Sequence, residues 1–196
     1  GQSIPNLDYG IAPGVAKTYV KLYRQNLLKA FELLADGQDL GTQLKEMFAQ
    51  IAQEHGIVPS LNSRDGYTKL EATCLKKFIK DEAVITKAQE FARRKAEEET
   101  DRSTYQAMEA FIHNLNTMHS RAGAQIPFSS VNYGMDTSLE GRMVIKNLLL
   151  ATEAGLGNGE TPIFPIHIFR VKEGINYNPG EPNYDLFKLA CRVSAK

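Results

Sequence analysis

A periodic run from Asp81 to His119 sets the architecture of this chain more than any other stretch. Apolar residues recur in it at steps of three and four, which predicts one long amphipathic helix. Pairs of opposite charge stand four residues apart in its middle, and each stabilises an exposed helix slightly. These pairs are Glu90–Arg94, Arg93–Glu97, Arg94–Glu98, Lys95–Glu99 and Glu98–Arg102. Two interpretations of this polar stretch stay open: a solvated helix face, or a face turned toward a partner subunit or an anionic ligand.

Three further helices are predicted upstream, and residues that favour turns separate them. They run from Val15 to Leu34 after the turn Ala12-Pro13-Gly14, from Gly41 to Glu54, and from Lys69 to Lys80. Asp36-Gly37 ends the first helix, and a loop from His55 to Tyr67 separates the last two. Residues 1–125 are therefore expected to form a mainly helical part that includes the long helix.

The hydrophobic period changes after Ala122-Gly123, and residues 126–196 predict the order strand, helix, strand, helix. The two strands cover 126–133 and 161–171, and the last helix covers 184–195. Strands joined by one helix are expected to be parallel, with a right-handed crossover. The second strand is nearly all apolar, which predicts that both of its faces are covered. The fold class is therefore α/β and rich in helix.

The helix between these strands begins at a polar turn. Thr137 and Glu140 have the spacing of a capping box, in which Thr137 is the N-cap. Asp136, Ser138 and Arg142 lie beside them, where a strand is followed by a helix, and ligands often bind at such a place in α/β proteins. Two interpretations stay open: a capped helix, or an anion site made of amides, hydroxyls and a guanidinium.

The composition excludes several classes of protein. The chain has 196 residues, with 23 Lys and Arg against 23 Asp and Glu, so a dedicated binder of DNA, RNA or an anionic membrane is not expected. It has no apolar run long enough to span a membrane and no secretory signal at its start. Cys74 and Cys191 stand far apart, which favours a reducing cytoplasm. The four histidines have no metal-ligand spacing, so no metal site is expected.

Several segments together resemble a known enzyme family. They are Gly1–Pro5, Asp8–Gly14, Glu99–Glu109, His113–Gly123, Pro127–Gly134, Asp136–Arg142, Gly155–Pro165 and Leu189–Lys196. In this order they resemble the anaerobic (class III, glycyl-radical) ribonucleoside-triphosphate reductases. The resemblance covers nearly the whole chain and implies a fragment of a ten-stranded α/β barrel that is built from two five-stranded halves.

The resemblance implies reduction of ribonucleoside triphosphates to deoxyribonucleotides by a thiyl radical, which a glycyl radical generates. An iron-sulfur, S-adenosylmethionine-dependent activase installs that radical, and the family also carries a structural zinc. The cysteine motifs and the radical glycine do not match here, so no catalytic residue and no cofactor is expected within the fragment, and the fragment alone is expected to be inactive. The implied partners are ribonucleoside triphosphates, deoxynucleoside triphosphate or ATP effectors, the activase and a second subunit in a homodimer. The alternative is a stand-alone helical module for dimerisation or nucleotide-effector binding.

The resemblance also implies site residues. Ser129, Ser130 and Asn132 are the polar positions of a barrel strand beside the substrate cavity. Ser130 and Asn132 share one face of that strand, while Ser129 points the other way. Gln2 and Glu109 resemble positions near the effector site, which in the family lies between long helices at the dimer interface. A carboxylate there accepts from a base or sugar group and repels the triphosphate.

Overall fold

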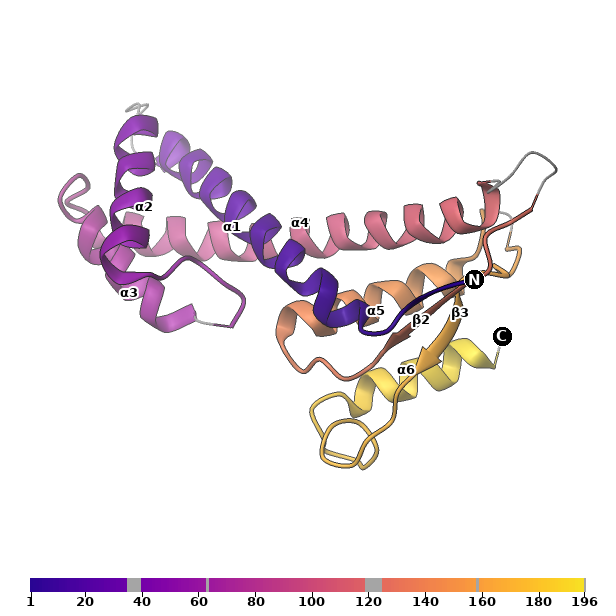
Figure 1. Ribbon diagram of the computed structural model, residues 1–196. Coiled ribbons are helices and arrows are strands. Elements are labelled where there is room, and N and C mark those ends of the chain that lie inside the picture. Colours follow the sequence, from indigo (N-terminus) through magenta and orange to yellow (C-terminus); the bar gives the residue numbers. More distant parts are fainter. Residues whose placement is uncertain (35–39, 63, 119–124, 158, 196) are drawn as a thin grey trace. The chain divides into compact units, whose positions relative to one another are not determined.

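The computed structural model describes residues 1–34, 40–62, 64–118, 125–157 and 159–195 (Figure 1). It divides into two compact units, one formed by residues 1–15 with 101–196 and the other by residues 16–100. The helices α1 (Leu7–Leu34) and α4 (Glu82–Thr117) each contribute to both units. None of the described helices is both long and apolar enough to cross a membrane.

The unit of residues 16–100 is entirely helical in its described part. The helices α2 (Gly41–His55) and α3 (Arg64–Leu75) complete it. The predicted second helix is confirmed, and the αL conformation of Gly56 ends it. Buried apolar side chains from all four helices form the core, and its largest fully buried members are Tyr19, Leu27, Phe31, Ile51, Leu75 and Ile85. The long helix predicted from Asp81 is also confirmed, since α4 spans Glu82–Thr117.

Two helix bounds differ from the prediction. The first helix begins at Leu7, so the turn expected at Ala12-Pro13-Gly14 is wrong and Pro13 lies within α1. Leu7, Ile11 and Val15 are spaced one helical turn apart and pack into the core of the unit of residues 1–15 and 101–196. This packing stabilises the helix on both sides of Pro13. The third helix begins and ends about five residues earlier than predicted. It ends early because the chain turns at Lys76, directly after the buried Leu75. The predicted end at Asp36-Gly37 lies outside the described residues.

The unit of residues 1–15 and 101–196 contains a parallel sheet. Its strands β1 (Gln2–Ile4), β2 (Ser129–Tyr133) and β3 (Ile166–Phe169) lie in the order β1–β2–β3. The parallel pairing of the two predicted strands is confirmed. The sequence analysis missed β1, because three residues are too few to show a period. The helices α5 (Leu139–Ala154) and α6 (Tyr184–Ser194) belong to the same unit, and both lie near the strands in Figure 1.

The two faces of this sheet differ in what covers them. Val131, Tyr133 and Phe169 point to one face and pack against α5 and α6 in a shared core. The register places the open-face residues in neighbouring positions, with Ser3 and Ile166 on either side of Ser130, and Ile168 beside Asn132. Ile166 is 42% exposed and Ile168 is 43% exposed. The prediction that both faces of the second strand are covered is therefore wrong within the described residues, since α5 and α6 lie on the same side.

The N-cap of α5 is Ser138 and not Thr137. The Ser138 Oγ accepts a hydrogen bond from the Gly141 N–H at 3.0 Å, while Thr137 is exposed. The Asp136 carboxylate accepts from the Ser138 N–H at 2.9 Å, which holds Ser138 in the extended conformation that an N-cap requires. The predicted capping box is wrong because this turn delays the start of the helix by one residue.

We expect Ser138→Ala to lower the free energy of unfolding by about 1 kcal/mol, because the Gly141 N–H loses its acceptor. Thr137→Ala should change it by less than about 0.5 kcal/mol, as is usual for an exposed side chain without such a bond. Urea unfolding of the two variants measures the difference. Equal effects of the two changes would contradict the assignment of the cap.

Candidate functional site

The candidate site lies at the carboxyl end of β2, where residues 134–138 connect the strand to α5. Three consecutive N–H groups, those of Gly134, Met135 and Asp136, point at one oxygen of Asp8 at 3.0, 2.9 and 3.0 Å. Such a concave set of amides is a common anion-binding device. Asp8 is only 1% exposed, so a carboxylate of the chain itself already occupies the position that a ligand anion would take.

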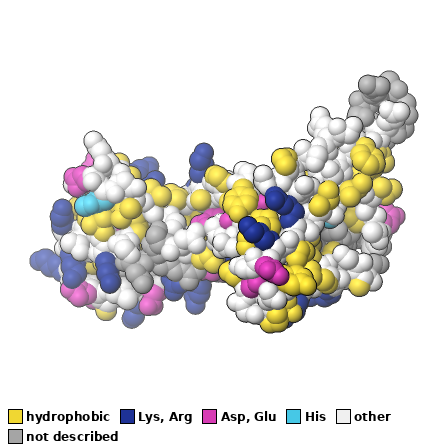
Figure 2. Space-filling view, turned by 60° about the horizontal axis from the view of Figure 1, so that its bottom comes forward, with side chains coloured by type: hydrophobic (Ala, Val, Ile, Leu, Met, Phe, Trp, Pro, Cys, Tyr) yellow, Lys and Arg dark blue, Asp and Glu magenta, His cyan; other side chains and the backbone are white. Residues whose placement is uncertain are grey.

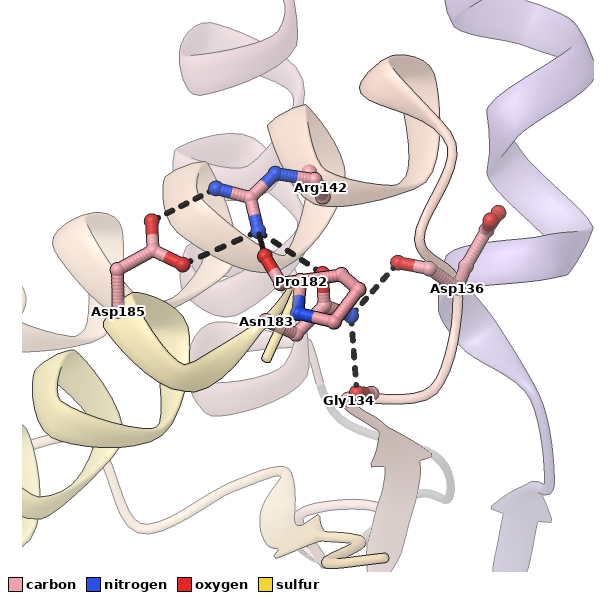
Figure 3. A network of polar contacts seen from close by, with 6 residues as sticks. All are labelled: Gly134, Asp136, Arg142, Pro182, Asn183 and Asp185. Atoms are coloured by element: carbon pink, nitrogen blue, oxygen red, sulfur yellow. Dashed lines mark hydrogen bonds and ion pairs between the residues drawn. The ribbon is translucent and has the colours of Figure 1, made fainter. Parts of the chain in front are cut away.

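Two fully buried asparagines hold the carbonyl groups of the same loop. Asn176 donates to the Gly134 carbonyl at 2.9 Å, and Asn183 donates to the carbonyls of Gly134 and Asp136 at 3.2 and 2.9 Å. Figure 3 shows Asn183 between the loop and Arg142. The loop is therefore fixed through both its N–H and its C=O groups, as buried backbone requires.

Arg142 does not serve as an anion site. Its guanidinium donates to both carboxylate oxygens of Asp185 at 3.1 and 2.7 Å, and also to the Asn183 side chain and the Pro182 carbonyl (Figure 3). This is a two-point pairing with a carboxylate, and it engages the cation that the sequence analysis considered for a ligand. Of the two interpretations of this turn, the structure favours the capped helix.

The three predicted substrate residues are divided between the two faces of β2. Ser130 and Asn132 are half-buried on the open face, beside Ile166 and Ile168 of β3. Ser129 is 8% exposed on the face that the helices cover. The Ser129 hydroxyl and the Asn132 side-chain oxygen are buried and have no hydrogen-bond partner among the described residues. Asn132 therefore keeps an unused acceptor next to the open face, which is notable because buried polar atoms are normally paired.

The two predicted effector residues lie on different elements of the same unit. Gln2 is the first residue of β1, exposed and paired in register with Ser129. Glu109 is exposed on α4. No hydrogen bond or ion pair joins them in the described part of the chain, so their shared role stays a prediction.

A polar network of Tyr133, His167 and Thr152 on the covered face, which we call the polar relay, was not predicted from the sequence. The Tyr133 hydroxyl lies 3.0 Å from Nδ1 of His167, and the Thr152 hydroxyl lies 3.2 Å from Nε2. Thr152 donates its own proton to the Leu148 carbonyl, so it accepts from Nε2–H and leaves Nδ1 to accept from Tyr133. Burial lowers the pKa of His167 to about 4, so the ring is neutral at pH 7. The only signal in the sequence was a histidine within an apolar run.

This relay predicts a dependence of stability on pH. The pKa of His167 is lower in the folded chain than the value of about 6.5 in an unfolded one, so the unfolded chain binds more protons between these pH values. Stability is therefore full above pH 6.5 and falls as the pH drops toward 4, by up to about 3 kcal/mol.

His167→Gln removes this titration. Its free energy of unfolding should fall less between pH 7 and pH 4 than that of the wild type, by about 2–3 kcal/mol. His55→Gln, at an exposed position, is the matched control and should follow the wild type. If the free energy of unfolding depends on pH in the same way in the wild type and in His167→Gln, then the pKa of His167 does not differ between the folded and the unfolded chain.

A second buried cluster lies in the unit of residues 16–100. Glu71 is fully buried, and its Oε2 accepts from the Tyr23 hydroxyl at 2.6 Å and from the Gln89 amide at 2.8 Å. Burial raises the pKa of Glu71 above its ordinary value, against the effect of these hydrogen bonds. The cavity beside Tyr23 and Tyr67 has a volume of only about 10 Å³, room for one water at most. We therefore assign this cluster to structure and not to ligand binding.

The described residues do not fit the metal and radical chemistry that the resemblance implies. Cys74 lies on α3 and Cys191 on α6, in separate units, whereas a structural zinc needs four ligands close together. In the described ranges no three His, Cys, Asp or Glu side chains form a group able to hold a metal ion. We assign no cofactor ligand to the described residues and derive no step through such a group.

The chain is a protein of the α/β class. It has a parallel sheet with helices on one face, and a loop at the carboxyl end of β2 leads into a helix. The family model for anaerobic ribonucleoside-triphosphate reductase matches residues 1–196, so the chain belongs to that family.

Curated relatives carry the same name. The anaerobic ribonucleoside-triphosphate reductase of Salmonella typhimurium is 36% identical over 117 residues, which is 59% of this chain and 16% of the relative. The reductase of Escherichia coli K12 is 35% identical over 52% of this chain and 14% of its own length. That of Enterobacteria phage T4 is 37% identical over 52% of this chain and 17% of its own length. The matched region thus spans between about a seventh and a sixth of these relatives.

Proposed function

We propose that this chain is part of an anaerobic ribonucleoside-triphosphate reductase and forms a wall of its substrate cavity. Membership of the family supports the activity, and the match over the whole chain favours this reading over a stand-alone helical module. Thiyl and glycyl radical chemistry is supplied by other parts of such an enzyme. The residues of this chain bind and orient the substrate.

The open face of the sheet is the observation that carries the proposal. Parallel sheets are normally covered on both faces, yet here the described helices cover only one. In an α/β barrel the helices lie outside and the uncovered face lines the interior. We therefore propose that β1, β2 and β3 are three strands of the ten-stranded barrel, with the face that carries Ser130 and Asn132 turned inward.

The polar positions on this face suit a ribonucleoside triphosphate. The Ser130 hydroxyl donates and accepts, and the Asn132 amide adds a donor group and its unpaired acceptor oxygen. Such groups bind ribose hydroxyls or phosphate oxygens, which orients the sugar for reaction. Ser129 lies on the covered face, so we leave it out of the substrate site although it belongs to the same motif.

The regulatory part of the proposal concerns α4 and β1. Glu109 on the exposed face of α4 and Gln2 on β1 are proposed to contact a deoxynucleoside triphosphate or ATP effector, in a homodimer that pairs through long helices. The charge pairs of α4 are compatible with either a solvated or a subunit-facing surface. A radical S-adenosylmethionine activase is the further proposed partner.

Anaerobic turnover of the longer protein that contains this chain tests the activity. After incubation with the activase, reductant and each ribonucleoside triphosphate, we expect deoxyribonucleoside triphosphates as products by chromatography. An activated preparation that forms no deoxyribonucleotide above background would contradict the proposed function.

A further inference from the structure

A groove between α1 and α2 is not explained by the proposed function. It has a volume of about 480 Å³, within the range of small-molecule sites, and lies wholly in the unit of residues 16–100. Its apolar part is formed by Val20, Leu28, Leu44 and Phe48.

The charge of this groove is one-sided. Four cations line it, Lys17, Lys21 and Arg24 from α1 and Lys45 from α2, and no acidic residue is among the described lining. The chain as a whole is neutral, with 23 basic and 23 acidic residues, so this surplus is local. No ion pair within the described residues involves the three lysines, whereas the charge of Arg24 also acts on the buried carboxyl group of Glu71. Figure 2 shows one face of the molecule, where Lys and Arg, Asp and Glu, and hydrophobic side chains are interspersed.

Arg24 and Phe48 give the groove a flat recognition surface. The Arg24 guanidinium lies over the Phe48 ring, 5.0 Å from its centroid, and the Arg24 Nε is buried without a hydrogen-bond partner in the described part of the chain. An aromatic ring of a ligand stacks well on such a pair.

We propose that this α1–α2 groove binds a small organic polyanion with an aromatic body, the chemistry of a nucleoside polyphosphate. The three lysines have no ion pair among the described residues, and they favour a ligand with several negative charges, because a single carboxylate leaves most of them unbalanced. The apolar part of the groove favours a ring over a bare phosphate chain. The site is separate from Ser130, Asn132, Gln2 and Glu109, all of which belong to the other unit.

Fluorescence titration of the chain with methylanthraniloyl-ATP, and its displacement by unlabelled ATP, tests this site. The double variant Lys21→Gln/Lys45→Gln should weaken binding at least about tenfold, since it removes two charge-assisted contacts. Lys29→Gln is the matched control, because Lys29 is exposed on α1 outside the groove, and it should bind within about twofold of the wild type. Circular dichroism checks that the variants fold.

Three results would overturn the proposal. The first is equal binding in the double variant and in Lys29→Gln, or no displaceable binding at all. The second is displacement by inorganic triphosphate as effective as that by ATP, which would show attraction by charge without an aromatic site. The third is binding lost in Asn132→Ala but kept in the double lysine variant, which would place the nucleotide on the sheet face and leave the proposed function standing.

Discussion

Asp8→Ala is expected to lower the free energy of unfolding by about 3–5 kcal/mol, because it leaves two buried N–H groups and one part-buried N–H group without an acceptor. The bonds to Gly134, Met135 and Asp136 join residues more than 120 positions apart, so the loss also frees the start of α1 from the end of β2. Asp8→Asn keeps one acceptor oxygen without the charge and should cost less, about 1–3 kcal/mol. Chemical unfolding followed by circular dichroism measures both.

Asp81→Ala is the matched control for this variant. Asp81 is exposed and accepts from the Ala83 and Val84 N–H groups at 2.8 and 3.4 Å, as an N-cap of α4 does. Its loss should cost about 1 kcal/mol, since water can replace it at the exposed amides. If Asp8→Ala costs no more than Asp81→Ala, the three-amide contact does not hold the loop in solution.

Gly141→Ala should destabilise the chain by about 3 kcal/mol or more. A Cβ added at Gly141 would lie at or inside 2.5 Å of three atoms of the Asp136 side chain. Asp136 cannot move away freely, because it is 5% exposed and its carboxylate holds the Ser138 N–H. We expect a large fall in the urea midpoint and in the thermal midpoint of this variant.

Gly10→Ala is the matched control, and it is expected to stabilise the chain instead of destabilising it. Gly10 is exposed within α1, and a Cβ there would meet nothing within 4 Å. Alanine has the higher helix propensity, so this change should stabilise by up to about 1 kcal/mol. A loss of stability in Gly10→Ala similar to that in Gly141→Ala would mean that the close approach at Asp136 is not the cause.

Periodicity predicted the helices well where one face is consistently apolar. The apolar residues of α2 and of α4 recur with helical spacing, and both helices were predicted correctly from it. This spacing is visible even where the rest of the segment is highly charged. The turn predicted at Pro13 is wrong because the packing of Leu7 and Ile11 in the core outweighs the local preference of the Ala-Pro-Gly sequence for a turn.

The contacts of the candidate site could not be predicted from local sequence patterns. Asp8 and the loop at Gly134 are distant in sequence, and nothing near Asp8 indicates that three amides will face it. Asn176 and Asn183 lie in a polar loop that resembles solvent-exposed sequence, yet both are fully buried. The alternation along β2 did predict that Ser130 and Asn132 share a face, because side-chain direction in a strand is a local property.

Steady-state kinetics of the longer enzyme with Asn132→Ala and Ser129→Ala test the assignment of the substrate face most directly. Both residues lie on β2, but Asn132 is on the open face and Ser129 is on the covered one. We expect Asn132→Ala to lower kcat/KM for ribonucleoside triphosphates by about 10–100-fold through loss of substrate hydrogen bonds, and Ser129→Ala to leave it nearly unchanged. Equal kcat/KM values in the two variants, or a larger loss in Ser129→Ala, would contradict a substrate wall on the open face of the sheet.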